Sequence, residues 1–306
     1  MAIPHSATDP VRASRRNFII GAAAALAAAM TSGSWVVITR LGVTTTLTPF
    51  DTAFLRFAIP TLILLPVLMR EGFALKRIGV GRMALMIAGA GLPFALVAAA
   101  GMQLAPAAHA GALMPGSIPL FVTALAFLFE RDRLDGGRAA GFAFIVAGVI
   151  AIGGYNLFLG VPGQWRGHLF FLAGGLLWAI YTVTFRRVGI GAWHGTALIN
   201  FYSTLILIPI YIAVGSRLPV TPWPELTLQV AFQGVIAGVL AISAYAAGVR
   251  RLGSARAAAF VALTPAVAAV VAIPVLGEWP DAATTAGIVF VGLGVMLASG
   301  AIGRRA

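Results

Sequence analysis

The chain has 306 residues, of which 60% are hydrophobic and only 10% are charged, and its mean hydropathy is +0.96. An average soluble domain is about 25% charged and about half apolar, so this composition excludes a water-soluble globular protein and predicts an all-α integral membrane protein. The net charge of +12 would suggest a nucleic-acid partner for a soluble protein, but these cations gather at the ends of apolar segments. With no cysteine, the chain has neither disulfides nor thiolate metal sites.

Apolar stretches of about 20 residues, the length that crosses a bilayer, follow one another along the chain. Each is expected to be helical, because an open backbone cannot lie in lipid. We predict a tail over 1–17, a first repeat over 18–158 and a second repeat over 159–306. The ten predicted spans are 18–39, 50–69, 82–101, 107–129, 137–158, 167–186, 193–214, 228–249, 255–276 and 281–301.

The distribution of Lys and Arg predicts the orientation. With the N-terminus in the cytoplasm, 17 of the 21 cations lie on the cytoplasmic side, three lie on the other side, and Arg56 falls inside a span. Such a bias predicts that both termini are cytoplasmic, in a multi-pass protein of the inner membrane. Arg15 and Arg16 also resemble part of a twin-arginine export signal, but we favour a positive-inside anchor, because nine more spans follow.

An internal repeat divides the chain. Pro119, Asp135 and Gly141 recur as Pro265, Asp281 and Gly287, always 146 positions later. In the second span of each half, the stretch 52–57 lies over 196–201 at an offset of 144, so that Arg56 matches Asn200. Each copy has five spans, and an odd number makes the two copies insert in opposite directions. The sequence therefore predicts ten transmembrane helices as two inverted five-helix repeats, with a substrate site near the midplane between them.

Several short motifs are those of a known family. They are Gly33-Ser34 ahead of Arg40-Leu41-Gly42, Leu55-Arg56-Phe57, Ala147-Gly148-Val149, and Leu263-Thr264-Pro265 with Leu276-Gly277-Glu278. On these motifs the chain resembles the drug/metabolite transporter superfamily, EamA type, over essentially its whole length. The sequence departs from the family pattern in two places, where Ser32 replaces a Trp and Arg131-Asp132 replaces Gly-Glu. The resemblance implies a carrier of amino acids or other metabolites, usually an exporter.

Arg56 is the first candidate site residue, because a guanidinium in hydrocarbon costs several kcal/mol unless it is paired or faces water. One interpretation is a helix anchor whose side chain reaches the outer headgroups or pairs with Asp51. The other is a clamp for a substrate carboxylate. Asn200 holds the equivalent place in the second copy, which would make the site asymmetric.

Aromatic side chains at intramembrane depth form a second candidate set. Trp178 is too deep for the interface that lipid-facing Trp prefers, so we expect it to face protein or a substrate. Rings at such a site would suit amphipathic solutes through stacking and cation–π contacts; ordinary interhelical packing is the alternative. The other members are Trp35, Tyr181, Tyr202 and Tyr245.

Hydroxyls, prolines and a histidine complete the candidates. Ser32 and Thr264 adjoin family motifs and are expected to contact the substrate. Pro119 and Pro265 are repeat mates at mid-span, where a missing N–H bends a helix and can form a hinge. His109 is a candidate for a proton-linked gate, although an interfacial histidine is the more ordinary interpretation.

The carboxylates all fall in the tail or at span ends, and no motif indicates a metal, a cofactor or bound nucleotide. We therefore expect no enzyme and no cofactor. The predicted function is secondary transport of small amphipathic metabolites by alternating access, with amino-acid export first. A broader organic-solute or drug exporter is the alternative, and an intramembrane enzyme is a distant third. The expected partners are a small-molecule substrate and the lipid bilayer, without nucleic acid, for a monomer.

Overall fold

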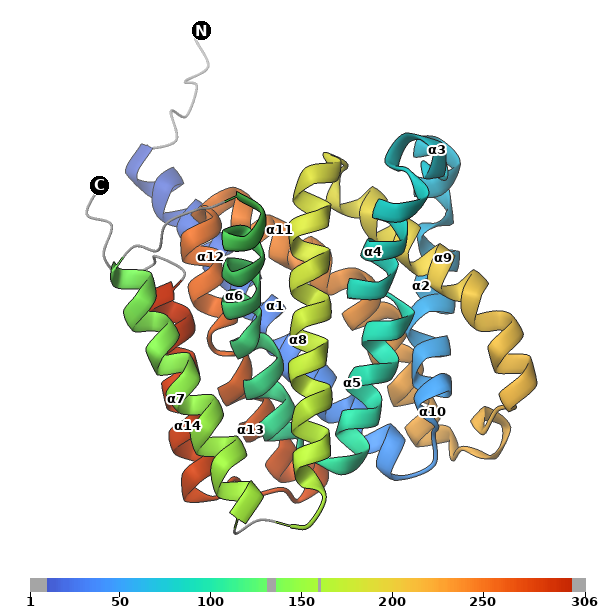
Figure 1. The fold of residues 1–306 in the computed structure, drawn as a ribbon. Coiled ribbons are helices and arrows are strands. Elements are labelled where there is room, and N and C mark those ends of the chain that lie inside the picture. The colour runs from blue at the N-terminus through green and yellow to red at the C-terminus, as the bar shows by residue number, and fades with distance from the viewer. Residues whose placement is uncertain (1–9, 131–135, 159–160, 299–306) are drawn as a thin grey trace, which may run out of the picture.

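A computed structural model describes residues 10–130, 136–158 and 161–298 as an all-helical bundle (Figure 1). Among these residues, eight helices are long and apolar enough to cross a membrane, and two shorter apolar helices accompany them. The first half contains α1 (Pro10–Thr44), α2 (Pro49–Glu71), α3 (Leu75–Ile78), α4 (Val80–Ala90), α5 (Leu92–Leu104), α6 (Ala107–Glu130) and α7 (Gly136–Phe158). The second contains α8 (Gln164–Val188), α9 (Ala192–Val214), η1 (Leu218–Val220), α10 (Trp223–Gln229), η2 (Val230–Leu240), α11 (Ala241–Leu252), α12 (Ser254–Val261), α13 (Thr264–Leu276) and α14 (Ala282–Ala298).

Three of the predicted spans are helical, as expected, but each is interrupted. The span over 82–101 is divided at Gly91 into α4 and α5, and the span over 255–276 is divided between Val261 and Thr264. The span over 228–249 contains η2, a segment with the wider π-helical hydrogen bonding. Glycine and π turns both interrupt the regular helix ladder. Hydrophobic length alone does not reveal such interruptions.

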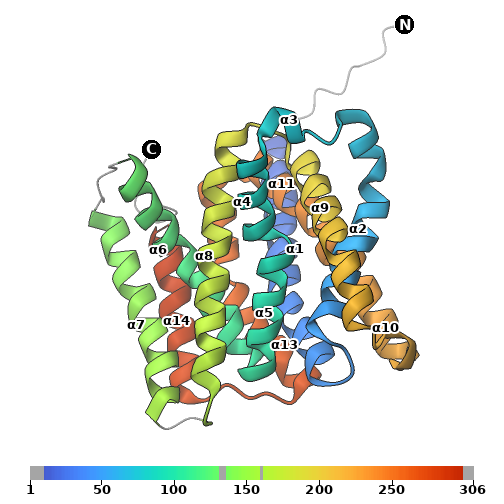
Figure 2. The same ribbon diagram turned by 45° about the vertical axis from the view of Figure 1, so that its right-hand side comes forward.

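The two halves exchange their first helices. Helix α1 packs against α11 and α13 of the second half, and α8 packs against α4, α5 and α6 of the first. The second helices of the halves, α2 and α9, pack together, as do the fifth helices, α7 and α14. Figure 2 shows α8 beside α4 and α5, with α1 behind them. Each contact thus has a counterpart with the halves interchanged, as expected for an inverted repeat.

Glycines form the crossing of α7 with α14. A Cβ atom added to Gly148 would lie 2.8 Å from the carbonyl oxygen of Gly287, and one added to Gly294 would lie 2.6 Å from that of Gly141. At the offset of 146, Gly141 corresponds to Gly287 and Gly148 to Gly294, so the two close approaches are repeat mates. Small residues at these points let the two backbones touch. In lipid, where the hydrophobic effect does not drive helix association, such close packing holds helices together.

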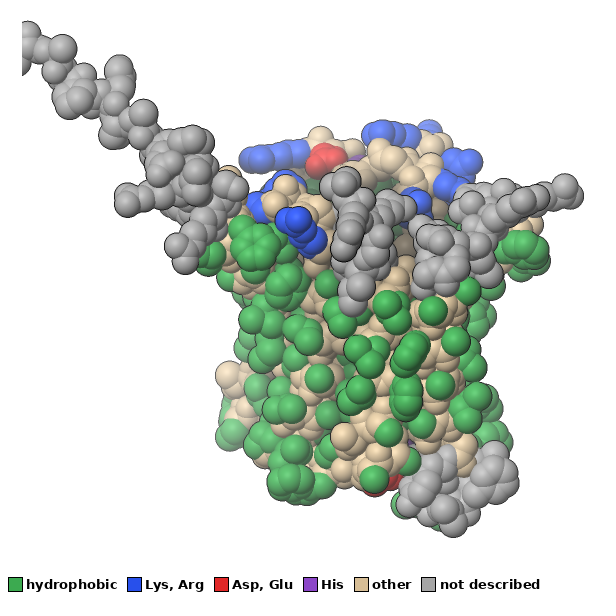
Figure 3. Space-filling model, turned by 90° about the vertical axis from the view of Figure 1, so that its left-hand side faces the viewer, with side chains coloured by type: hydrophobic (Ala, Val, Ile, Leu, Met, Phe, Trp, Pro, Cys, Tyr) green, Lys and Arg blue, Asp and Glu red, His purple; other side chains and the backbone are tan. Residues whose placement is uncertain are grey.

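The two ends of the bundle differ in charge. Figure 3 shows Lys and Arg side chains gathered at one end, where α3 also lies. We call it the basic end, and the other the opposite end. The exposed cations of the basic end are Arg70, Lys76, Arg77, Arg82, Arg186, Arg187, Arg250 and Arg251.

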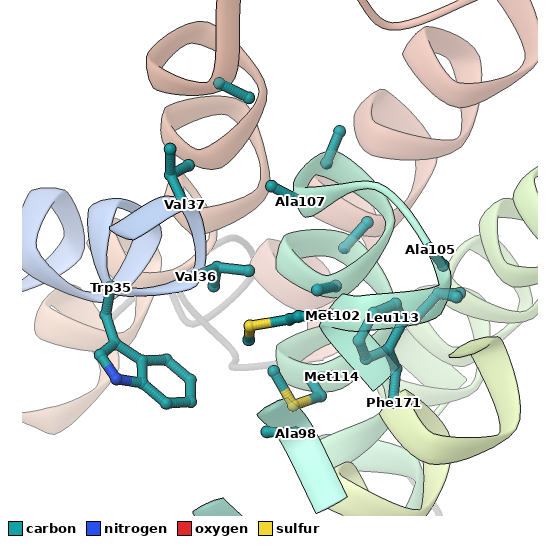
Figure 4. Packing of buried hydrophobic residues seen from close by; sticks show 14 of the residues in the cluster. Trp35, Val36, Val37, Ala98, Met102, Ala105, Ala107, Leu113, Met114 and Phe171 are labelled. Atoms are coloured by element: carbon teal, nitrogen blue, oxygen red, sulfur yellow. The ribbon is translucent and has the colours of Figure 1, made fainter. Parts of the chain in front are cut away.

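The largest buried apolar cluster lies between α1, α5, α6 and α8, inside the bundle. Met102, Leu113 and Phe171 are at most 1% exposed, and Figure 4 shows them gathered beside Trp35. This cluster brings the first helix of each half into contact with the third and fourth helices. It therefore lies directly beside the candidate site.

We predict that Gly148→Ala destabilises the fold. The new methyl group would meet the carbonyl oxygen of Gly287 at 2.8 Å and the backbone of Val291 at 3.0 Å, and overpacking of this kind typically costs about 1–3 kcal/mol. Thermal unfolding in detergent measures the effect as a lower midpoint. Gly154→Ala is the control, because its nearest neighbour would lie at an ordinary 3.7 Å and alanine favours a helix. Equal midpoints for the two variants would contradict the crossing.

Candidate functional site

A row of aromatic rings runs between the two halves. Trp35 of α1 stacks on Phe94 of α5, with ring centroids 5.9 Å apart, and Phe94 contacts Trp178 of α8 at 5.1 Å. Trp178 continues to Tyr181 at 5.4 Å, and Tyr181 to Phe185 at 5.4 Å. The distances are those of attractive aromatic pairs. We call these five residues the aromatic row.

Arg56 lies at the Trp35 end of this row. Thr48 caps α2 together with Asp51, and Arg56 follows seven residues after Pro49, about 10 Å into the helix at 1.5 Å per residue. Its guanidinium carbon lies 4.6 Å from the centre of the Trp35 ring. The side chain thus points inward, and the anchor interpretation with its reach toward the headgroups is wrong.

Among the described residues, no carboxylate forms an ion pair with Arg56. Its Nε and Nη1 atoms are buried and have no hydrogen-bond partner. Asp51 instead accepts hydrogen bonds from Thr48, from the Tyr211 hydroxyl at 2.7 Å and from Ser216 at 3.0 Å. A desolvated cation–π contact contributes about 2 kcal/mol, whereas burying the cation costs several kcal/mol. An anion that accepted from the two free nitrogens would offset the difference.

A buried polar network holds the Trp35 ring. The Trp35 indole N–H donates to Gln233 Oε1 at 2.9 Å, and Gln233 Nε2 donates to Thr39 Oγ1 at 2.9 Å. Gln229, one turn before Gln233, donates to the Ile38 carbonyl at 2.6 Å. Sequence reasoning missed both glutamines, as well as Phe94. Two amides four residues apart in an apolar span share one helix face, and polar residues at that depth are a signal that could have found them.

The row lies beside interruptions in the third helix of each half. At Gly91 the chain turns from α4 into α5, and the backbone N–H of Leu92 donates to Ser203 Oγ of α9 at 3.2 Å. In the second half, η2 carries Gln233, and its Gly238 lies against Pro60 of α2. Discontinuous helices in corresponding places of two repeats are typical of transporter binding sites.

Of the predicted site residues, Trp35, Arg56, Trp178 and Tyr181 are brought together, and the others lie elsewhere. The Tyr202 hydroxyl donates to the Phe73 carbonyl at 3.1 Å, just past the end of α2 at the basic end. Tyr245 is 43% exposed on α11, and Asn200 is buried on α9. Among the described residues, no ring contact joins Tyr202 or Tyr245 to the aromatic row.

The two predicted hydroxyls and two predicted prolines have separate environments. Ser32 Oγ donates to the Ala28 carbonyl one turn back at 2.9 Å, as most intramembrane serines do, whereas Thr264 Oγ1 is buried without a partner. Pro119 lies inside α6. Pro265 is the second residue of α13, immediately after the interruption, so it starts a helix there and does not bend a continuous one.

His109 is the third residue of α6, and its side chain is buried. It is 3% exposed, and its Nδ1 lies 2.9 Å from Nε2 of His168, which is 5% exposed. Its Nε2 lies 2.9 Å from Thr284 Oγ1. Because α8 and α14 belong to the second half, His109 joins the two halves at the opposite end. We call His109, His168 and Thr284 the histidine latch.

An ion pair lies beside the histidine latch. Arg40 of α1 pairs with Glu278, between α13 and α14, and also donates to the Ala105 carbonyl at 2.8 Å. The other Glu278 oxygen accepts from the backbone N–H of Ala107 at 2.8 Å. At this end, therefore, the halves are held together by both an ion pair and a histidine pair.

The geometry offers several contacts to a solute. In the described residues, no group of three or more His, Asp and Glu side chains could hold a metal ion. A cation with free nitrogens, a row of rings and two interrupted helices can bind an amphipathic solute between two halves. Interlocked halves with two interrupted helices are the architecture of a multi-pass membrane transporter.

The comparisons with known proteins identify the family. Residues 19–154 and 165–300 both match the EamA-like transporter family, and the chain belongs to that family. It is 27% identical over 207 residues to the "Uncharacterized transporter YyaM" of Bacillus subtilis (strain 168), and 29% identical over 133 residues to an "Uncharacterized transporter" of Archaeoglobus fulgidus. These matches cover 63% and 43% of this chain, and 64% and 46% of the respective relatives.

A solved structure confirms the fold. It matches with a TM-score of 0.60 and 19% identity over 95% of this chain and 99% of the other, and its title is only "Crystal structure of protein". At that identity the likeness shows the fold alone.

We predict that Gln233→Leu lowers the thermal unfolding midpoint. The substitution leaves the buried Trp35 N–H without its acceptor and Thr39 without its donor, and a buried polar group left unsatisfied costs about 1–3 kcal/mol. The matched control is Gln103→Leu, because Gln103 is exposed and makes only a 3.4 Å bond to the Val43 carbonyl. If both leucine variants unfold at the wild-type temperature, the network does not hold Trp35.

Proposed function

We propose that this protein is a secondary transporter that moves small amphipathic metabolites, with amino acids first among them, outward by alternating access. The observation that carries the proposal is the inward-facing Arg56 at the end of the aromatic row. The two unpartnered nitrogens would bind a carboxylate, and the rings would contact an apolar side chain. An amino-acid ammonium group would lie against ring faces.

The proposed binding site lies between the halves. Trp35 and Phe94 come from the first half, and Trp178 and Tyr181 come from the second. A relative movement of the halves would therefore change the surroundings of a bound solute. This is what alternating access at an inverted-repeat interface requires. Thr264 would add a hydroxyl, since its buried oxygen has no partner.

The proposed location is the inner membrane, with both termini in the cytoplasm. The support is the gathering of exposed Lys and Arg at the basic end (Figure 3), since cytoplasmic loops carry the excess of cations. We further propose that the two repeats extend over 18–158 and 159–306 after a tail over 1–17.

A second candidate function is the transport of organic carboxylates that lack an ammonium group. It is favoured because no described carboxylate lies on the aromatic row, where it could bind an ammonium group. The described carboxylates are at helix ends: Asp51, Glu71, Glu225, Glu278 and Asp281. An ammonium group would then have only ring faces and dipoles as partners. A broader drug exporter would not need Arg56.

We predict that Trp178→Ala reduces saturable flux of labelled amino acids from proteoliposomes by about tenfold or more. Trp178 is partly buried, and a ring contact of the kind it would make with a bound solute contributes about 0.5–1.5 kcal/mol beyond the apolar area that it covers. Trp223→Ala is the matched control, because Trp223 is 79% exposed and lies away from the aromatic row.

Arg56→Gln is the companion variant in the same assay. It should raise the half-saturation concentration for amino acids but leave that for their methyl esters unchanged, since an ester lacks the anion. Equal effects on acids and esters would contradict a carboxylate clamp. If no amino acid is transported and simple carboxylates are, the second candidate function replaces the first.

A further inference from the structure

The histidine latch closes the opposite end with two imidazole rings. His109 comes from the first half, and His168 and Thr284 come from the second. All three side chains are at most 5% exposed. The latch is therefore formed only while the two halves are together at that end, and any movement that opens the end must break it.

The latch is complete when both rings are neutral. A neutral imidazole has one N–H donor and one acceptor nitrogen. His109 can donate from Nδ1 to His168 and accept the Thr284 hydroxyl at Nε2, or the same chain of bonds can run in reverse. Either arrangement pairs both nitrogens of His109 and Nε2 of His168.

Two carboxylates lie near the closed latch, and among the described residues neither forms an ion pair with its histidines. Asp281 Oδ1 accepts from the Thr284 backbone N–H at 2.6 Å, and Glu278 is paired with Arg40. The nearby cations are Arg40 and the exposed Arg166, whose guanidinium carbon lies 5.5 Å from the Trp165 ring centre. Asp281 would attract a charged imidazole and Arg40 would repel it, so burial of the charge would be poorly compensated and water would relieve that cost.

We propose that His109 and His168 form a proton-binding site that holds the opposite end closed while neutral and favours its opening when protonated. The sign follows from linkage: the open state exposes the rings to water and binds the proton more tightly, so the open fraction rises as pH falls. This inference rests on the proposed alternating access, and it assigns a pH-dependent closure to one end.

The proton would enter and leave on the same side. Ten residues of α8 separate His168 from Trp178, about 15 Å along the helix. The intervening space holds Met102, Leu113 and Phe171, which are at most 1% exposed and apolar. The buried Ser117 lies against Gly175 of α8, but its hydroxyl donates to the Met114 carbonyl at 3.0 Å, so apolar side chains separate the pair from the aromatic row. The pair would therefore set how often the end opens, without carrying protons across the membrane.

Because the chain has no cysteine, one introduced thiol reports the opening directly. Ala112→Cys places it one turn from His109 at a position that is 0% exposed, and Val161→Cys places a reference thiol at the same end at a position that is 63% exposed. Each single-cysteine protein is reconstituted in liposomes and treated from outside with a membrane-impermeant maleimide. Labelling of any thiol is faster at high pH because more of it is thiolate. Dividing the labelling rate of Ala112→Cys by that of Val161→Cys corrects for this effect.

We expect this ratio to rise about fivefold or more between external pH 8 and pH 5, which is the lower end of typical coupling between two sites. In His109→Gln and in His168→Gln, the ratio should lose its pH dependence. Thr284→Val keeps both rings, so its ratio should retain the pH dependence. His194→Gln is the matched control, because His194 lies at the basic end against the Gly72 carbonyl and outside the latch.

Three results would overturn the proposal. They are a wild-type ratio that does not change with external pH, a pH dependence that persists in both glutamine variants, and a ratio that follows the pH inside the liposome. Size-exclusion chromatography should show each variant as a single folded species. Two independent histidine variants are used so that misfolding of one does not decide the result. The assay needs no substrate, so its failure leaves the proposed transport function standing, and failure of the flux assay leaves the latch standing.

Discussion

The exchange of first helices between the halves is the constraint on which the rest of the structure depends. Helix α1 is held by α11 and α13, and α8 is held by α4, α5 and α6. In lipid such contacts form only where backbones can approach closely, and Gly33 against Val267 and Gly175 against the Met114 carbonyl provide those approaches. This exchange carries Trp35 and Trp178 toward each other from opposite halves. The candidate site therefore exists only because the halves interlock.

The site itself departs from the symmetry that builds it. In the first span of each half, the stretch 40–42 lies over 187–189 at an offset of 147. At this offset Trp35 corresponds to Thr182 and Trp178 to Thr31, while Arg56 corresponds to Asn200 in the second span. The cation and the rings consequently occupy one region of an otherwise two-fold interface. A solute with an anionic end and an apolar body would match this arrangement of cation and rings. The unpartnered nitrogens of Arg56 and the row of rings thus define both ends of the solute that the site would accept.

The fold could be predicted because lipid restricts the chain to helices and duplication leaves a fixed offset in the sequence. The site could be predicted only in part. Trp178 and Arg56 were detectable, because an indole and a guanidinium are costly at that depth. The interruption at Gly91, the η2 segment and the pairing of His109 with His168 depend on contacts between residues far apart in the chain, 59 positions apart for the histidines. A linear pattern does not contain that information.

The measurement that tests the central claim most directly is ligand-induced thermal stabilisation of the purified wild type and of Arg56→Gln, over matched pairs of carboxylic acids and their methyl esters. A ligand that binds the native state raises its unfolding temperature by mass action. If Arg56 binds the anionic end of the solute, acids with apolar or aromatic bodies will stabilise the wild type more than their esters, and Arg56→Gln will abolish the difference. Equal stabilisation by acid and ester in the wild type would contradict the account.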